Sequence, residues 1–224
     1  MTIVYCLLSV AASRQWIIHQ MDIHNAFLHG DLDEKALLQI DHYKSVLSRH
    51  FKTKDLGPLK YFLSLEVARS FTGIFINQRK YTLDILSNSG QLGARPASFP
   101  MEQNLKLTAS DGNLLSDPSP YRQLVGRLIY LTITRPDIAF AVNILSQFMH
   151  TPRAPHLTAA HQVLRYFKCT SGHGIFFAAS SGLQLIAYTD SDWASCSTTR
   201  RSTTATSSNS GPIPFLGAPR NRQQ

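Results

Sequence analysis

Cysteine is scarce in this sequence of 224 residues: only Cys6, Cys169 and Cys196 occur, and they lie far apart. The spacing excludes a CxxC metal knuckle and an even-numbered disulfide framework, so we expect a reducing compartment. No run of hydrophobic residues approaches the roughly 18 that a membrane-spanning helix needs. Gly-x-Ser-x-Gly nucleophile elbows and glycine-rich phosphate-binding loops are missing as well. We therefore expect an intracellular protein, in the cytoplasm or nucleus, with no membrane partner.

Acidic residues are also few: 14 Asp and Glu stand against 22 Lys and Arg, which gives a formal net charge of +8. This balance favours a polyanionic partner, and nucleic acid, either RNA or DNA, is the partner we expect. The basic residues fall in short groups instead of one long tract, and each group alone fits an ordinary solvated surface. The candidates for binding nucleic acid are Lys52, Lys54, Arg79, Lys80, Arg165 and Lys168.

Hydrophobic residues make up 43% of the sequence, which is enough for a sizeable core. Near the start of the chain their spacing predicts a helix over 2–16, an extended stretch over 17–27 and an amphipathic helix over 40–51. The residues Asp-Leu-Gly-Pro at 55–58 predict a turn that closes the second helix.

Aromatic and β-branched residues then predict strands over 61–67 and 73–76, which a loop at 68–72 joins into a hairpin. A short helix over 81–86 is predicted to end near Gly90, because glycine can adopt the left-handed conformation of a helix cap. The chain up to residue 92 therefore combines helices with an antiparallel hairpin.

The second half of the chain begins with residues 93–120, whose Pro, Ser, Asp and Asn content predicts an extended linker. The polar Ser-, Thr-, Pro- and Gly-rich residues from 202 to 224 predict a tail without regular structure. Between these two segments the sequence predicts helices over 121–132, 136–149 and 156–169 and short strands over 175–178 and 183–188.

Residues 20–32 (QMDIHNAFLHGDL) closely resemble the first catalytic motif of the reverse transcriptases of copia-type retrotransposons. The resemblance continues in the same order along the chain and covers nearly all of residues 3–204. Its further segments are 54–63 (KDLGPLKYFL), 121–131 (YRQLVGRLIYL), 134–143 (TRPDIAFAVN), 161–168 (HQVLRYFK) and 188–194 (YTDSDWA).

The resemblance implies an α+β fold made of incomplete parts. We expect a broken reverse-transcriptase palm with a β-hairpin, a small helical thumb and connection region, and a stub of ribonuclease H-like sheet. The domains implied are a palm and thumb remnant at 1–92, the linker at 93–120, the helical connection at 121–182, the ribonuclease H stub at 183–204, and the tail at 205–224.

By resemblance, Asp22 is the first metal-binding aspartate of the polymerase site. Phe27 matches the side chain that screens the sugar 2′ position of the substrate. Without the surrounding motif, a carboxylate at position 22 would be read as a turn or cap residue. Polymerisation uses two metal ions held by several converging carboxylates, so Asp22 needs partners.

Those partners are missing from the sequence. The family brings two further aspartates on a Tyr-Val-Asp-Asp turn, and no Tyr-x-Asp-Asp occurs in this chain. Roughly 80 residues of the family pattern are absent after about Leu38, an order-of-magnitude estimate from the family's usual layout. Mg²⁺ is implied by the resemblance, and we expect it to bind weakly here because a lone carboxylate holds it poorly.

Asp190 resembles the first metal ligand of ribonuclease H, and its site is also incomplete. The glutamate and the aspartates that follow it in the family are not found downstream. Reading the family's next strands one nucleotide out of phase can give segments like Ala205-Thr206-Ser207-Ser208. We therefore hypothesise a frameshift near Thr204.

These observations favour a degenerate fragment of an RNA-directed DNA polymerase and ribonuclease H polyprotein without catalytic activity. One alternative is a remnant that still binds nucleic acid through its basic residues. Another is a wrongly spliced part of an active element. A third, an active enzyme that borrows carboxylates from a second protein, demands sub-ångström placement between two chains and is the weakest.

Overall fold

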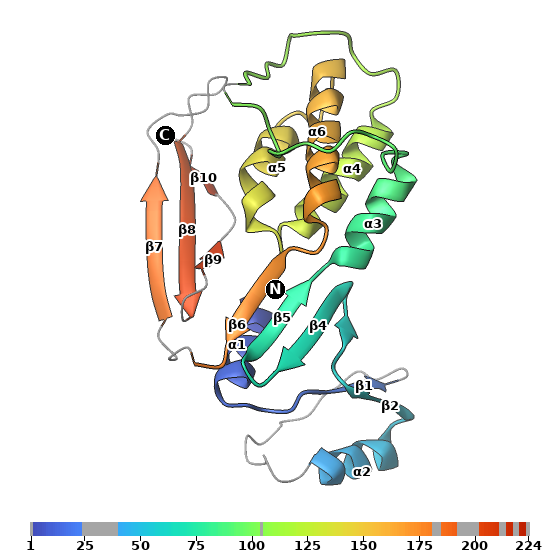
Figure 1. Ribbon diagram of the computed structural model, residues 1–224, viewed down its shortest axis with the longest axis vertical. Coiled ribbons are helices and arrows are strands. Elements are labelled where there is room, and N and C mark those ends of the chain that lie inside the picture. The colour runs from blue at the N-terminus through green and yellow to red at the C-terminus, as the bar shows by residue number, and fades with distance from the viewer. Residues whose placement is uncertain are drawn as a thin grey trace. The chain divides into compact units, whose positions relative to one another are not determined.

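The computed structural model describes residues 2–23, 40–103, 105–180, 185–191, 202–210, 214–216 and 220–222 (Figure 1). Helices and antiparallel sheets both occur, which confirms the predicted α+β class. The chain divides into two compact units. The smaller unit is Trp16–Lys60, and the larger unit combines Met1–Gln15 with Tyr61–Gln224.

The helices follow the hydrophobic spacing of the sequence to within a few residues. They are α1 (Thr2–Ser13), α2 (Ile40–His50), α3 (Arg79–Asn88), α4 (Ser119–Leu131), the 3₁₀ turn η1 (Pro136–Ile138), α5 (Ala139–Ser146) and α6 (Ala154–Thr170).

The strands form three sheets. They are β1 (His19–Ile23), β2 (Thr53–Pro58), β3 (Tyr61–Phe62), β4 (Leu65–Ser70), β5 (Gly73–Asn77), β6 (Gly174–Ala178), β7 (Leu185–Ser191), β8 (Ser202–Ser210), β9 (Pro214–Leu216) and β10 (Arg220–Arg222).

The turn predicted at 55–58 is wrong, because these residues belong to β2, which pairs with β1. The pairing passes from Gln20–Gly57 to Met21–Asp55, so one extra residue bulges out of β2. Gly57 has φ +75° and its N–H donates to Asp55 Oδ1 at 2.8 Å. The glycine that suggested a turn thus serves a β-bulge, which needs the same left-handed conformation.

The helix α2 is tied to this ribbon by one lysine. Lys44 Nζ lies 2.8 Å from Asp55 Oδ2 and 3.0 Å from His19 Nδ1. The ammonium and the Gly57 N–H both favour the charged carboxylate, so the pKa of Asp55 lies below its ordinary value.

In the larger unit, the single strand predicted over 61–67 is also wrong. These residues instead form a hairpin of β3 and β4, and its turn residues, Leu63 and Ser64, have φ +48° and +61°. β4 pairs with β5 through a turn at residues 71–72, shorter than the predicted loop 68–72. β6, about a hundred positions later in the chain, adds to β5 and completes a sheet of order β3-β4-β5-β6.

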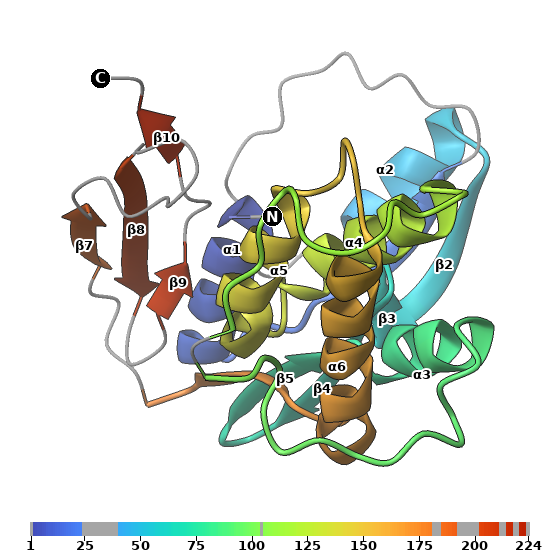
Figure 2. The same cartoon turned by 90° about the horizontal axis from the view of Figure 1, so that it is seen from above.

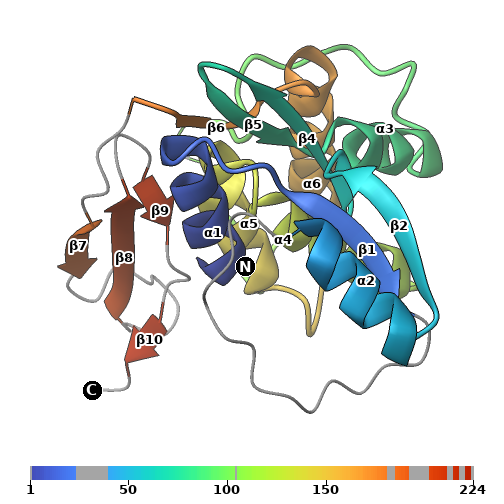
Figure 3. The ribbon, with the colours of Figure 1, turned by 90° about the horizontal axis from the view of Figure 1, so that it is seen from below.

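One face of this sheet is covered by α1. Leu65, Ile74 and Phe177 point to that face and are buried, and Phe177 packs against Tyr5 with ring centroids 6.1 Å apart. α1 lies along β5 and β6, as Figure 3 shows. Its own buried side chains, which include Leu8, Ala11 and Ala12, explain why this apolar segment folds as a helix against a sheet.

The helices α3 to α6, which Figure 2 shows from above, share one hydrophobic core. Tyr121 is fully buried in it, and its hydroxyl donates to the Leu145 carbonyl at 2.7 Å. The remaining core side chains come from all four helices and from η1, among them Ile85, Leu128, Ile138, Leu145 and Phe167.

Residues 93–118 contain no helix and only an isolated bridge at Leu114, in the part of the segment that the structure describes. They are nevertheless anchored. Met101, Leu107 and Leu115 pack against the helical core, and Arg153 donates to the carbonyls of Ala109 and Gly112, each at 2.7 Å. The predicted linker therefore lies along the core.

The tail was predicted to lack regular structure, and this is wrong for the described residues. β8 pairs with β7 from Leu185–Ser210 to Ser191–Thr204, and β9 and β10 pair with β8. The physical reason is that threonine has a high strand propensity and that pairing satisfies backbone groups whatever the side chains are. The hypothesised frameshift stays a prediction.

Candidate functional site

Asp22, the predicted polymerase ligand, lies on β1 and is exposed. Across the ribbon it pairs with Lys54, a residue of opposite charge. Among the described residues, no three His, Cys, Asp or Glu side chains come together in an arrangement that could hold a metal ion. The described residues around Asp22 therefore do not supply the cluster of carboxylates that a two-metal site needs. Phe27 lies outside the described residues.

Asp190, the predicted ribonuclease H ligand, lies on β7, where its backbone pairs with Ala205 of β8. It belongs to a different unit from Asp22, since Asp22 falls within Trp16–Lys60.

The basic residues predicted to bind nucleic acid fall into two kinds. Lys52 and Lys54 are exposed on the smaller unit, and Arg79 and Lys80 are exposed at the start of α3. The Lys80 ammonium lies 5.9 Å from the centre of the Tyr61 ring, a cation–π contact. These four side chains are accessible to a phosphate backbone.

Arg165 and Lys168 have structural partners instead. Arg165 Nε donates to the Arg95 carbonyl at 2.8 Å, and Lys168 Nζ donates to the carbonyls of Leu92 and Ala94. Both hold the segment that follows α3 against α6, so they are poorer candidates for binding a separate molecule.

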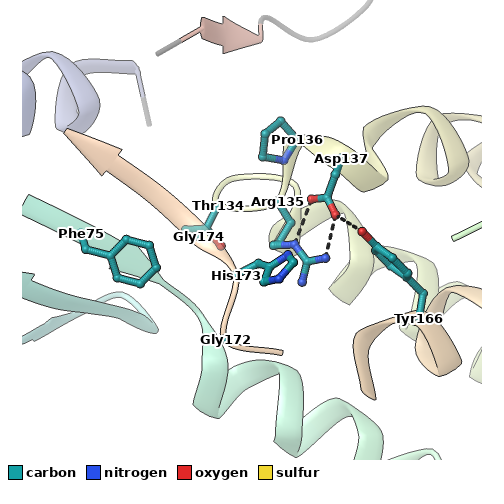
Figure 4. Close-up of a pocket in the computed structure, with 9 residues that line it drawn as sticks. All are labelled: Phe75, Thr134, Arg135, Pro136, Asp137, Tyr166, Gly172, His173 and Gly174. Carbon is teal, nitrogen blue, oxygen red and sulfur yellow. Dashed lines mark hydrogen bonds and ion pairs between the residues drawn. The ribbon is translucent and has the colours of Figure 1, made fainter. Parts of the chain in front are cut away.

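A pocket of about 510 Å³ opens in the larger unit (Figure 4). Three parts of the chain form it: β5, the turn that leads into η1, and the end of α6 with the start of β6. Its lining residues are Phe75, Thr134, Arg135, Pro136, Asp137, Tyr166, Gly172, His173 and Gly174.

One wall of the pocket is a network centred on Arg135, whose side chain is only 3% exposed. Its Nε and Nη2 donate to the two carboxylate oxygens of Asp137 at 2.9 and 2.7 Å. Nη1 donates to the Thr170 carbonyl at 2.7 Å, and the guanidinium lies 4.9 Å from the centre of the Phe167 ring. Arg135 thus joins η1 to the end of α6.

The network also shifts two pKa values. Burial alone would raise the pKa of Asp137, but the hydrogen bonds and charge of Arg135 outweigh it and lower that pKa. The Tyr166 hydroxyl donates to Asp137 Oδ2 at 2.9 Å. Its pKa is raised by burial and by this bond to a carboxylate. Both groups therefore hold their charge states at neutral pH and do not exchange protons readily.

The chemistry of this wall suits binding rather than catalysis. Asp137 remains ionised and paired, Tyr166 remains protonated, and Arg135 is held on three sides by its partners. Residues 134–143 resemble a segment of the family, but the sequence predicted no role for them. A signal was available: Arg135 and Asp137 are the only charged residues in the mostly apolar stretch 128–142, which suggests a buried ion pair.

Comparisons with known proteins decide the family. The chain is 47% identical over 148 residues to the retrovirus-related Pol polyprotein from transposon RE1 of Arabidopsis thaliana, which covers 66% of this chain. It is 35% identical over 172 residues, 72% of this chain, to the corresponding polyprotein from transposon TNT 1-94 of Nicotiana tabacum. The chain belongs to the retrovirus-related Pol polyproteins of copia-type retrotransposons.

This Pol polyprotein chain spans only a small part of its long relatives: the match covers 10% of the RE1 polyprotein and 13% of the TNT 1-94 polyprotein. An uncharacterised mitochondrial protein of Arabidopsis thaliana is 46% identical over 171 residues, 68% of its own length. No family model and no solved structure matches the chain. None of its described helices is long and apolar enough to cross a membrane.

Proposed function

We propose that this chain is a fragment of the reverse transcriptase and ribonuclease H region of a retrotransposon Pol polyprotein and that it has no catalytic activity. Its family membership and its match to about a tenth of the RE1 polyprotein support an origin as a piece of a longer protein. The order of the motifs along the sequence supports the assignment to this region.

The surroundings of Asp22 support the loss of activity most directly. Two-metal phosphoryl transfer needs several carboxylates around ions roughly 4 Å apart. Among the described residues, no cluster of three metal-ligating side chains includes Asp22, and the residue across the ribbon from it is the basic Lys54. The sequence also lacks the Tyr-x-Asp-Asp turn that would bring two further aspartates.

The origin of the fragment can be tested at the level of the gene. Sequencing a long transcript and the genomic locus across the codons for residues 37–41 and 203–205 should give continuous sequence without a segment encoding Tyr-x-Asp-Asp. An intact intervening segment would show that the chain is a splice form of a complete element, and the proposal of a decayed copy would fail.

The second candidate function is binding of nucleic acid, and the exposure of Lys52, Lys54, Arg79 and Lys80 favours it. A chain with a net charge of +8 should bind polyanions through counterion release. The affinity should then fall steeply between 50 and 200 mM salt, about a factor of ten or more if three or four phosphates are contacted. Binding that does not change with salt would contradict this function.

A further inference from the structure

The two faces of the β3–β6 sheet differ in what covers them. The face that carries Ile74 and Phe177 packs against α1. On the opposite face, Ala68, Phe75 and Phe176 lie directly across from one another on β4, β5 and β6. Ala68 is exposed and Phe176 is 41% exposed, so this face, called here the open face, presents aromatic rings to solvent.

The two phenylalanine rings on the open face are neighbours. Residues directly opposite in an antiparallel pair have Cβ atoms about 5 Å apart, which applies to Phe75 and Phe176. A Cβ atom on Gly73 would come within 2.8 Å of Cζ of Phe176. The ring of Phe176 therefore extends over Gly73, and the missing side chain at that position gives it room to lie along the sheet.

Phe75 also belongs to the pocket, which makes the pocket continuous with the open face. Figure 4 shows Phe75 and Tyr166 on opposite sides of the pocket, with His173 and Gly174 between them. A volume of about 510 Å³ falls within the range of sites for small organic ligands. The pocket is therefore large enough to hold one unstacked nucleic-acid base.

The charged side chains on this surface carry both signs: Lys80 lies over the Tyr61 ring, and Glu66, directly across from Tyr61, accepts from the Lys80 backbone N–H. Glu66 and Ala68 are two residues apart on β4, so their side chains lie on the same face of the sheet. Tyr61 pairs with Glu66 and therefore also lies on the open face. The carboxylate of Asp137 inside the pocket is offset by Arg135. With a net charge of +8, the chain as a whole attracts polyanions.

We infer that the open face and its pocket form a binding site for single-stranded nucleic acid, with bases stacked on Phe176 and Phe75 and phosphates near Lys80. Aromatic rings on a sheet, flanked by cations, bind single strands because every base has a flat face that can stack. A duplex cannot bind in this way, since its bases are already stacked on one another. The inference rests on the nucleic-acid-binding function proposed above and assigns it a site.

The test is a titration of the full chain with a fluorescein-labelled 12-nucleotide oligothymidylate, followed by fluorescence anisotropy. Phe176→Leu keeps an apolar side chain but removes the ring, and it should weaken binding by roughly 5- to 150-fold, the effect of losing one stacked base. Phe140→Leu, on α5, is the matched control because Phe140 is 73% exposed and lies off the sheet. Its affinity should equal that of the unaltered chain, and a duplex of the same length should bind more weakly than the single strand.

A double variant, Lys52→Gln with Lys54→Gln, separates this inference from the broader function. Weakening by Phe176→Leu, with Phe140→Leu unchanged, supports the site on the sheet. Weakening by the double lysine variant while both phenylalanine variants bind normally overturns the site but keeps nucleic-acid binding through basic residues. If the unaltered chain does not bind the oligonucleotide at 50 mM salt, both proposals fail.

Discussion

Arg135 and Asp137 form a two-pronged ion pair, with Nε and Nη2 donating to separate carboxylate oxygens at 2.9 and 2.7 Å. The guanidinium is buried, whereas the carboxylate, which lines the pocket, is 38% exposed. The pair therefore connects the helical core to the surface on which we place the binding site.

Replacing Arg135 with methionine should destabilise the chain, because the Thr170 carbonyl loses its bond from Arg135 and the Asp137 carboxylate loses two of its donors while keeping Tyr166. We expect a cost of about 3 kcal/mol, at the low end for a broken buried pair because Asp137 can regain water. Urea denaturation measures it. Arg79→Met, at an exposed site on α3, is the control and should change stability by less than about 0.5 kcal/mol. Equal effects of the two changes would show that the ion pair contributes nothing.

The ion pair should also make the free energy of unfolding depend on pH in the acidic range. The pKa of Asp137 in the folded chain lies below its ordinary value of 3.8, so the unfolded chain takes up a proton first as the pH falls. The stability that the charged form contributes is present above about pH 4 and is lost as the pH drops through the folded-state pKa. The free-energy difference between the unaltered chain and Asp137→Asn should therefore shrink from pH 6 to pH 3. A constant difference over that range would contradict the assignment.

A second acid-sensitive group lies at the start of α6. His156 is buried and stacks on Phe148 with ring centroids 3.9 Å apart. Its Nδ1 accepts from the Arg153 N–H and its Nε2 donates to the Thr108 carbonyl, each at 3.0 Å, so both nitrogens suit the neutral ring. Burial lowers the pKa of His156 below 6.5, although its bond to Thr108 opposes the shift.

Because the unfolded chain binds this proton at about pH 6.5 and the folded chain resists it, His156 should make stability fall as the pH drops below 6.5. The slope from one such group is at most about 1.4 kcal/mol per pH unit. Thermal or urea unfolding at pH 7.5 and 5.5 should show a smaller loss for His156→Gln than for the unaltered chain. An identical loss would mean that His156 protonates equally in both states.

Because Gly57 serves the β-bulge in β2, replacing it should weaken the β1–β2 ribbon locally. A Cβ atom there would meet nothing within 4 Å, so Gly57→Ala should cost only the backbone strain of φ +75°, about 1–2 kcal/mol. Hydrogen exchange should speed up at the Leu59 amide, which donates to the Ile18 carbonyl in the same ribbon. Gly93→Ala, where a Cβ atom also meets nothing, is the control. Unchanged exchange at Leu59 would count against the bulge.

Local patterns in the sequence predicted the helices. They did not predict the order of the strands in the sheets, which depends on pairing between residues far apart in the chain. The apolar spacing of 156–169 gave α6 within two residues, because one helix face must be buried. Nothing near Ile74 indicates that Phe177 pairs with it, since that contact joins residues about a hundred positions apart. Gly57 was predicted to lie in a turn because turns and β-bulges both use the left-handed backbone conformation that glycine adopts.

The candidate site shows the same division. Asp22 and the basic residues were predicted from motif and charge, which are local properties of the sequence, and their roles stay predictions. The open face could not be predicted in this way, since its aromatic rings come from β3, β5 and β6, and only the sheet register brings them to one side. Arg165 and Lys168 looked like nucleic-acid ligands until their carbonyl partners were known.

The central claim is that the chain has lost catalysis, and primer extension tests it most directly. The purified chain is incubated with a primed RNA template, deoxynucleotides and Mg²⁺ or Mn²⁺, beside an Asp22→Asn variant, and the RNA of the hybrid is assayed for cleavage. We predict no extension and no cleavage above background, with the two chains indistinguishable. Metal-dependent extension by the unaltered chain that Asp22→Asn abolishes would contradict the account.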